Sequence, residues 1–338
     1  MKQKTIVLGA PKTFDLSDQI VLNLECLGFK VIDISFDQKF RYKNLFQRLH
    51  NLVRKLLFND RSLKIRFRFD DYKADIYKKV NAVEKVDYAL IIRPDNYPIY
   101  FLKDLKERTS LMVGYQWDGL HIFPEIRKYY NLFDRFYVFD PADVSPIHHP
   151  LTNFYFDYKS SLTPPFTKKK VYFLGTFLES RAPFLKKIIS EIKRAGYEPQ
   201  IYLLTRNSGK HLSYIDCGAT FLSTPLSFEE NLNHMQNAAV LIDFLNNKHQ
   251  GLSFRIFEAI GSGKKILTNN ASVRNYDFYN ENNIFVFNEN NMDAIAEFLQ
   301  KPFIPLDAEL KKKYSFTNWI HYVLQIPPFA PICLPDVK

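Results

Sequence analysis

The sequence is poor in cysteine and contains no long apolar run. Its three cysteines, among 338 residues, lie far apart and match no metal-ligand spacing, so we expect reduced thiols without a chemical role. No window approaches the roughly 20 apolar residues of a membrane-spanning helix, which leaves only peripheral contact with a membrane. The first residues contain one four-residue apolar run, far short of a signal-peptide core, and we therefore expect a cytoplasmic protein.

The chain also lacks the glycine pattern of a dinucleotide-binding turn. Its first strand candidate ends at Gly9-Ala10-Pro11, which is not a G-x-G-x-x-G turn, and the first half contains no such turn elsewhere. This disfavours an NAD-dependent dehydrogenase. Apolar residues, in contrast, are plentiful at 46% of the chain, and its length is typical of two domains of about 150 residues each.

The first half alternates predicted strands and helices. Residues 5–9 and 31–35 read as buried strands, and residues 17–27 between them have helical spacing. Further strands are expected over residues 88–92, 111–115 and 135–139, with a helix over 99–108. This βαβ order predicts a parallel sheet covered by helices on both faces.

The alternation of predicted strands and helices stops between residues 146 and 170 and then resumes. Proline, threonine, serine and lysine dominate this stretch, which neither a helix nor a central strand tolerates. Strands are expected next over 171–175, 200–204, 239–243, 265–268 and 284–287, and helices over 182–195, 228–236, 253–261 and 292–299. We therefore predict an α/β protein with two Rossmann-like, doubly wound domains, 1–160 and 168–313, that face each other across a ligand-binding cleft.

The segment 250–263 carries the strongest indication of function. Gly251 and Leu252 lead into a predicted helix at Ser253, so free backbone N–H groups and a positive helix end suit a diphosphate. Arg255 adds a charge-assisted contact, and Glu258 can accept hydrogen bonds from a ribose diol. The structural alternative is a plain strand–loop–helix whose two late glycines stop the helix.

This segment resembles the donor-binding segment of GT-B glycosyltransferases, and the whole chain resembles bacterial lipopolysaccharide-core and capsule glycosyltransferases. The resemblance implies that the N-terminal domain binds the acceptor and that the C-terminal domain binds a nucleotide sugar. It also implies that Glu258 holds the ribose and that Gly251, Leu252 and Ser253 lie near the phosphates. Gln250 stands where the retaining group usually has a second glutamate, so retention and inversion both stay open.

Other donor-site candidates lie at strand ends of the second half. Gly175 and Thr176 follow its first strand, where GT-B enzymes bring the backbone near the donor, and Arg181 lies at the next helix entry. Thr268 and Asn269 end a later strand and are candidates for contacts with the donor sugar. For these two, simple strand termination is the alternative.

Asp118 is the candidate catalytic base of the first half. It follows a strand in Gln116-Trp117-Asp118, so its carboxylate is expected in the cleft, where it would deprotonate an acceptor hydroxyl. The alternative is a helix N-cap. Asp95, Asp140 and Asp143 follow other strands and are rival bases, although Asp140 precedes a proline and is more typical of a turn.

No cofactor or metal ion is expected, because the nucleotide sugar is a substrate. His148 and His149 are adjacent, but they have no carboxylate or cysteine neighbours at ligand spacing. The chain has no Asp-x-Asp motif of the kind that metal-dependent GT-A transferases use.

The positive charge is concentrated in residues 39–69. This segment has ten lysines and arginines against the single Asp60, while the net charge of the whole chain is +10. Phe46, Leu49 and Val53 have the spacing of an amphipathic helix whose apolar side meets protein or lipid. We expect its basic side to contact an anionic membrane surface; the alternative is a core-facing helix with a solvated basic side.

The sequence thus favours a glycosyltransferase that moves a sugar from a nucleotide sugar to a surface glycan or glycolipid at the cytoplasmic face of the membrane. A sugar-nucleotide 2-epimerase would use the same fold without an acceptor. A basic protein that binds nucleic acid or an anionic surface is the third hypothesis, although no nucleic-acid motif is visible and no nucleic-acid partner is expected. Residues 314–338 are predicted to cross back to the first domain as a helix with Trp319 buried, followed by an extended tail.

Overall fold

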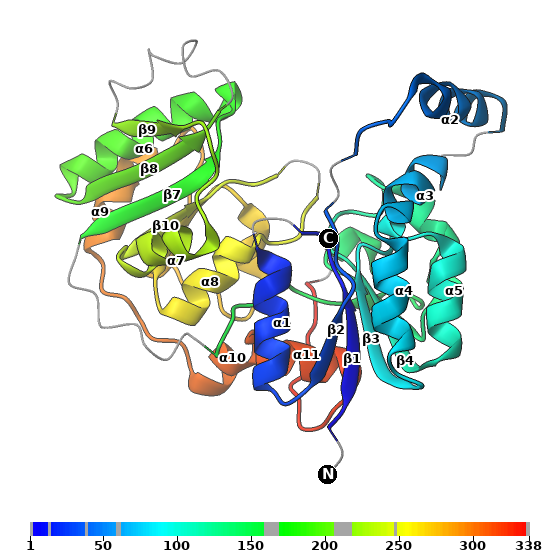
Figure 1. The fold of residues 1–338 in the computed structure, drawn as a ribbon. Coiled ribbons are helices and arrows are strands. Elements are labelled where there is room, and N and C mark those ends of the chain that lie inside the picture. The colour runs from blue at the N-terminus through cyan, green and yellow to red at the C-terminus, as the bar shows by residue number, and fades with distance from the viewer. Residues whose placement is uncertain are drawn as a thin grey trace. The chain divides into compact units, whose positions relative to one another are not determined.

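The computed structural model describes residues 3–12, 15–37, 40–58, 62–158, 169–205, 218–246 and 249–335. The chain divides into two compact units. Unit 1 comprises residues 1–151 with 323–327, and unit 2 comprises residues 152–322 with 328–338. Each unit contains one six-stranded sheet (Figure 1).

The sheet of unit 1 is parallel and has the strand order β2-β1-β3-β4-β5-β6. Its strands are β1 (Thr5–Gly9), β2 (Lys30–Asp33), β3 (Val86–Ile92), β4 (Thr109–Gln116), β5 (Arg135–Val138) and β6 (His149–Pro150). All five predicted strands of this half are confirmed, and β6 is added. The strand order reverses between β1 and β3, and ligands of such sheets bind beyond the carboxyl ends of the strands at that point.

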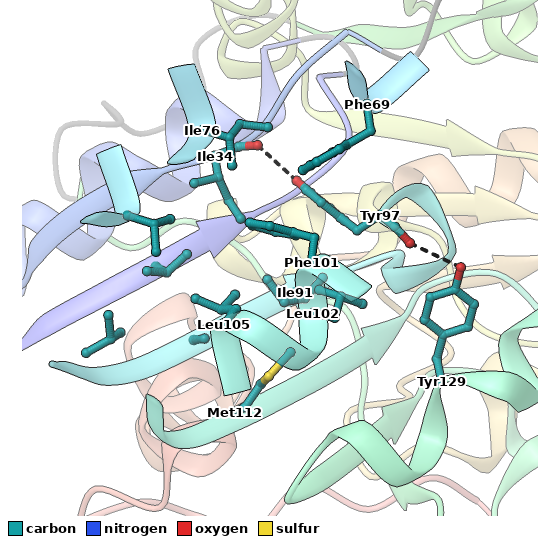
Figure 2. Close-up of a cluster of buried hydrophobic side chains, with 14 of the residues drawn as sticks. Ile34, Phe69, Ile76, Ile91, Tyr97, Phe101, Leu102, Leu105, Met112 and Tyr129 are labelled. Atoms are coloured by element: carbon teal, nitrogen blue, oxygen red, sulfur yellow. Dashed lines mark hydrogen bonds between the residues drawn. The ribbon is translucent and has the colours of Figure 1, made fainter. Parts of the chain in front are cut away.

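Five α-helices accompany this sheet in the described part of unit 1. They are α1 (Leu16–Cys26), α2 (Leu45–Phe58), α3 (Ser62–Asp70), α4 (Lys73–Asn81) and α5 (Ile99–Glu107). Figure 2 shows the core between sheet and helices, where Phe69 and Phe101 pack around Tyr97. The buried Tyr97 hydroxyl donates to the Ile34 carbonyl at 3.1 Å, and a Cβ on Gly9 would lie only 2.8 Å from that hydroxyl. Glycine at the end of β1 therefore makes room for the tyrosine.

Unit 2 repeats this architecture with the parallel strand order β12-β11-β10-β7-β8-β9. Its strands are β7 (Lys170–Thr176), β8 (Glu198–Leu204), β9 (Ala219–Leu222), β10 (Val240–Asp243), β11 (Lys265–Thr268) and β12 (Ile284–Val286). Its α-helices, within the described residues, are α6 (Ala182–Arg194), α7 (Phe228–Gln236), α8 (Phe254–Ser262), α9 (Ile295–Gln300), α10 (Ala308–Lys313) and α11 (Phe316–Leu324). The strand order reverses between β7 and β10.

Side chains alternate across the sheet of unit 2 and build two cores. Phe173 belongs to the core that includes α6 and α9, whereas its neighbour Tyr172 belongs to the core that includes α7 and α8. The predicted strands and helices of this half are confirmed, because buried apolar runs of four or five residues alternate with amphipathic stretches. Because both faces of the sheet are buried, the orientation of each strand, and therefore the position of the residues at its end, is fixed.

The last helix, α11, lies at the division between the units in the sequence. Trp319 is fully buried, and its indole N–H donates to the Thr152 carbonyl at 2.9 Å. Four residues later, the carbonyl of Val323 accepts a hydrogen bond from the Tyr137 hydroxyl of unit 1 at 3.5 Å. In the described ranges, no helix has both the length and the apolar character needed to cross a membrane.

Candidate functional site

The carboxyl ends of β10 and β11 meet the start of α8 at one buried carboxylate. Asp243 is 4% exposed, and it accepts hydrogen bonds from the hydroxyls of Ser253 at 2.7 Å and Thr268 at 3.0 Å. Ser253 has an extended backbone and occupies the N-cap position of α8. Because hydrogen bonds to an ionised group are the stronger kind, Asp243 fixes the first turn of α8 against both strand ends.

Arg255 lies where the strand order of unit 2 reverses. Its guanidinium donates to the carbonyl of Ile242 in β10 at 3.2 Å and to that of Leu174 in β7 at 2.8 Å. It also lies over the Phe173 ring, 5.4 Å from the centroid. Arg255 therefore joins the two strands at the point where ligands of doubly wound sheets bind.

A second guanidinium, that of Arg181, lies within electrostatic range of the first. Arg181 ends a short 3-10 helix after β7 (Glu179–Arg181) and lies over the Phe244 ring, 5.3 Å from the centroid. Burial lowers the pKa of Arg181, the negative charge of Asp243 opposes this, and the positive charge of Arg255 adds to the lowering. Within the described residues the Arg181 guanidinium has no hydrogen bond or ion pair, so it is available to an anion.

The loop before α8 contains backbone N–H groups that are not paired within the described residues. In the described part of the chain, the N–H groups of Gly251, Leu252 and Ser253 have no hydrogen-bond acceptor. The loop is pinned from behind, because the Leu252 carbonyl accepts from the Asn153 amide at 2.9 Å. The Leu252 side chain is buried in the core, so this residue offers only its N–H to a ligand. Unpaired N–H groups at a helix start form an anion site.

Glu258 lies three residues after Arg255, close to one turn further along α8. Its carboxylate is partly buried and has no hydrogen-bond donor among the residues that the structure describes. Burial raises the pKa of Glu258, and the charge of Arg255 opposes this rise. A carboxylate in this position is ready to accept hydrogen bonds from hydroxyl groups of a ligand.

The remaining predicted donor-site residues have mixed surroundings. A Cβ on Gly175 would lie 2.7 Å from the Phe173 ring, so glycine allows this ring to lie beneath Arg255. Thr176 is exposed. Thr268 is fully buried against Asp243, and Asn269 accepts a hydrogen bond from the Leu245 N–H at 2.7 Å. Thr268 therefore shapes the site from within rather than facing a ligand.

In unit 1, Asp118 is paired with an arginine that the sequence analysis did not assign. Arg93 follows β3 in the left-handed region, at φ 59°, and donates to Asp118 at 2.6 Å and to both oxygens of Asp95 at 2.9 and 2.8 Å. Its guanidinium lies 3.7 Å from the centroid of the Phe123 ring. Burial opposes the charge of Arg93, yet the two carboxylates raise its pKa overall.

This cluster replaces the helix N-cap that was the alternative role of Asp118, because no helix begins there. The Arg93, Asp95 and Asp118 side chains are 14%, 11% and 29% exposed, respectively. A left-handed backbone at a residue other than glycine costs about 1–3 kcal/mol and occurs often at functional sites. In the sequence, the pair Arg93-Pro94 directly after a predicted strand was the feature that could have indicated this cluster.

Two of the rival carboxylates of unit 1, Asp140 and Asp143, support loops. Asp140 accepts from the N–H of Ala142 two residues later, as expected for a turn former, and Asp143 accepts from the Leu120 N–H at 2.7 Å. Burial raises the pKa of Asp143, and His121 and His148 oppose this rise. His121 is exposed and follows Asp118 by three residues, so its imidazole belongs to the same loop, and the sequence analysis did not assign it.

The histidine pair has no metal-site neighbours. His148 approaches the Asp143 carbonyl through Nδ1 at 3.2 Å, and burial lowers its pKa. His149 lies in β6. Across the described ranges, no three side chains of His, Cys, Asp and Glu gather closely enough to hold a metal ion.

No protein-family model and no curated protein matches this sequence. Solved structures match along most of the chain, among them the following two. One is assigned as a UDP-N-acetylglucosamine 2-epimerase from Listeria monocytogenes, at 10% identity and a TM-score of 0.54, covering 99% of this chain and 100% of that one. The other is an α,α-trehalose-phosphate synthase (UDP-forming) from Burkholderia vietnamiensis, at 9% identity and a TM-score of 0.51, covering 89% and 92%. With two parallel six-stranded sheets in tandem and these neighbours, the chain has the GT-B fold of nucleotide-sugar glycosyltransferases and epimerases.

Proposed function

We propose that the protein is a glycosyltransferase that binds its nucleotide-sugar donor in unit 2. The observation that carries this proposal is the Arg181 guanidinium within electrostatic range of Asp243 and Arg255, together with the unpaired N–H groups at the start of α8. Two phosphates of a nucleotide diphosphate match a free arginine, a helix N-terminus and oriented N–H groups in charge and in hydrogen bonding. The Ser253 and Thr268 hydroxyls stabilise the Asp243 carboxylate without removing its charge, and this charge attracts the Arg181 guanidinium.

Each predicted donor contact has a distinct role in this proposal. Glu258 accepts hydrogen bonds from the ribose hydroxyls. These bonds are favourable because a partly buried carboxylate without hydrogen-bond donors is destabilised. Arg255 supplies positive charge to the phosphates while its own hydrogen bonds hold β7 and β10 in place. Thr176 and Asn269 line the approach for the sugar. No cofactor and no metal ion is needed.

The reaction is a substitution at the anomeric carbon of the donor sugar. The bond from this carbon to the diphosphate oxygen breaks, a bond to an acceptor hydroxyl oxygen forms, and the acceptor proton passes to a carboxylate. Asp118 is the proposed base, with Arg93 fixing its orientation. Arg181 and the helix N-terminus stabilise the negative charge that develops on the departing nucleotide diphosphate.

The proposed acceptor is a glycan or glycolipid of the lipopolysaccharide or capsule type, at the cytoplasmic face of the membrane. The basic segment 39–69 supports this proposal, because ten cationic side chains attract a phosphate-bearing, lipid-anchored acceptor and its anionic surroundings. A sugar-nucleotide 2-epimerase is the second candidate, favoured by the full-length structural likeness to such a protein. It would turn over the nucleotide sugar without any acceptor.

The first experiment is thermal denaturation with a panel of nucleotides and nucleotide sugars, comparing the wild type with Glu258→Gln. A ligand at about 100 times its Kd stabilises the folded protein by about 2.7 kcal/mol. We expect one nucleotide to raise the Tm of the wild type and to do so far less in the variant, which keeps the shape but loses the charge. If no nucleotide shifts the Tm, the donor site does not exist.

The same ligand then separates the two enzymatic candidates. Incubation of the stabilising nucleotide sugar alone, followed by chromatography of the products, should leave it intact for a transferase and convert it to its 2-epimer for an epimerase. Release of the nucleotide diphosphate only when a glycan acceptor is added supports transfer.

A further inference from the structure

The amphipathic helix α2 exposes its apolar side to solvent. Seven large apolar side chains of this helix are 38–81% exposed: Leu45, Phe46, Leu49, Leu52, Val53, Leu56 and Leu57. At 100° per residue they fall within one arc of about 140°. This set is called the α2 apolar face below. The expectation of a helix in this segment is confirmed, but the alternative of a core-facing helix is wrong.

The polar side of α2 is less exposed than its apolar side. The least exposed of its described side chains are Gln47, Asn51 and Arg54, whose spacing places them on the side opposite the α2 apolar face. The Asn51 amide donates to the Tyr42 hydroxyl at 2.8 Å, and His50, at the edge of the apolar face, packs on the Phe67 ring of α3. Figure 1 shows α2 next to α3 and away from the sheet of unit 1. This orientation is the reverse of that of a surface helix of a soluble domain, which buries its apolar stripe.

The charged residues within α2 are all positive. No acidic residue occurs between residues 40 and 58, and Arg48 and Lys55 are exposed and border the apolar arc. Lys64 and Arg66 of α3 are exposed as well. An apolar face bordered by cations matches a surface that offers acyl chains beneath phosphate groups. Nucleic acid would satisfy the cations but would offer nothing to seven apolar side chains.

We propose that α2 is an interfacial helix that inserts its apolar face into an anionic lipid bilayer. Insertion goes beyond the electrostatic attraction described under the proposed function, because it requires the leucines as well as the basic residues. The proposal of insertion rests on the proposed function only for the identity of the acceptor. Helix α3, which follows α2, contacts the cluster of Arg93, Asp95 and Asp118, since Arg68 of α3 donates to Asn96 at 3.1 Å, next to Asp95. Bilayer insertion would therefore hold the Asp118 loop close to a lipid-anchored acceptor.

The test is co-sedimentation of the full chain with vesicles of phosphatidylcholine alone and with added phosphatidylglycerol. We expect binding to the anionic vesicles and at least about tenfold weaker binding for Leu49→Glu/Leu56→Glu, because two apolar groups are lost from the inserted face. The matched control is Ile147→Glu/Ile304→Glu, which makes the same change at two other exposed apolar positions and should bind as the wild type does. All variants should keep the wild-type Tm, because none of the four side chains is buried.

Other results would overturn the proposal. Absence of vesicle binding by the wild type excludes the lipid surface. A dimer by light scattering without lipid, converted to a monomer by Leu49→Glu/Leu56→Glu, would make the α2 apolar face an interface between copies. Binding to oligonucleotides that survives this substitution, without vesicle binding, would assign the basic segment to nucleic acid. The nucleotide-dependent Tm shift reports on unit 2 alone, so failure of α2 insertion and failure of the donor site are distinguishable.

Discussion

The same substitution at two neighbouring arginines should separate structure from binding in unit 2. Arg255 donates two hydrogen bonds to the carbonyls of Leu174 and Ile242. Arg255→Met keeps the length of the side chain but leaves both carbonyls without this donor. Hydrogen bonds from a charged donor contribute about 1.5–3 kcal/mol each, so the low end of this range for the two bonds gives a loss of about 3 kcal/mol. At about 2–4 °C per kcal/mol for a domain of 150–250 residues, the Tm should fall by about 6–12 °C.

Arg181→Met is the matched comparison. Within the described residues, the Arg181 guanidinium has no hydrogen bond or ion pair, and its contact with the Phe244 ring is worth about 1 kcal/mol at a half-buried site. Its removal should change the Tm by less than about 4 °C. Loss of a charge-assisted contact with a phosphate should, in contrast, raise the Kd of the nucleotide by roughly 10- to 150-fold.

Calorimetric titration with the nucleotide that stabilises the wild type, together with Tm measurements, tests both expectations. Equal destabilisation by the two variants would mean that Arg181 is also a structural residue. An unchanged Kd of the nucleotide in Arg181→Met would show that no phosphate contacts Arg181 and would refute the donor site as described.

Three further predictions concern other parts of the molecule. Asp118→Asn should lower kcat about 100-fold or more without changing the donor KM, as expected for loss of a general base; an unchanged kcat in steady-state assays would assign the base elsewhere. Gly261→Ala should destabilise the protein by about 1–3 kcal/mol in urea unfolding, because the added Cβ would lie 2.3 Å from Cγ of Tyr155; wild-type stability would show that the tyrosine moves freely. Burial lowers the pKa of Lys264 to about 7 and that of Lys265 to about 8 from their ordinary 10.5, so between pH 7 and 10 the unfolded chain binds more protons and stability should rise with pH. Lys264→Met should flatten that rise in urea unfolding measured across this range, and an unaltered slope would contradict the assignment.

The element pattern of both halves was readable from the sequence because parallel, doubly buried strands are apolar runs with sharp ends. Residues 5–9, 239–243 and 265–268 show such runs and form β1, β10 and β11. Helix α3 was missed, because Ser62–Asp70 alternates apolar and basic residues in a pattern typical of strands. It is a helix in the protein, and Leu63 and Phe69 are its buried residues. When a segment has few apolar residues, tertiary packing rather than local periodicity determines its secondary structure.

The sequence by itself therefore determined the fold class, the segment 250–263 as the candidate donor site, and the amphipathic character of α2. Only the tertiary structure decided which residues meet. Leu174 and Ile242 lie 68 residues apart, and both reach Arg255 because β7 and β10 are neighbours in the sheet. Local sequence patterns indicate where the strands are, but they do not indicate the order of the strands in the sheet. The direction of the α2 apolar face was equally hidden, because an amphipathic pattern specifies two faces but not which one the rest of the protein covers.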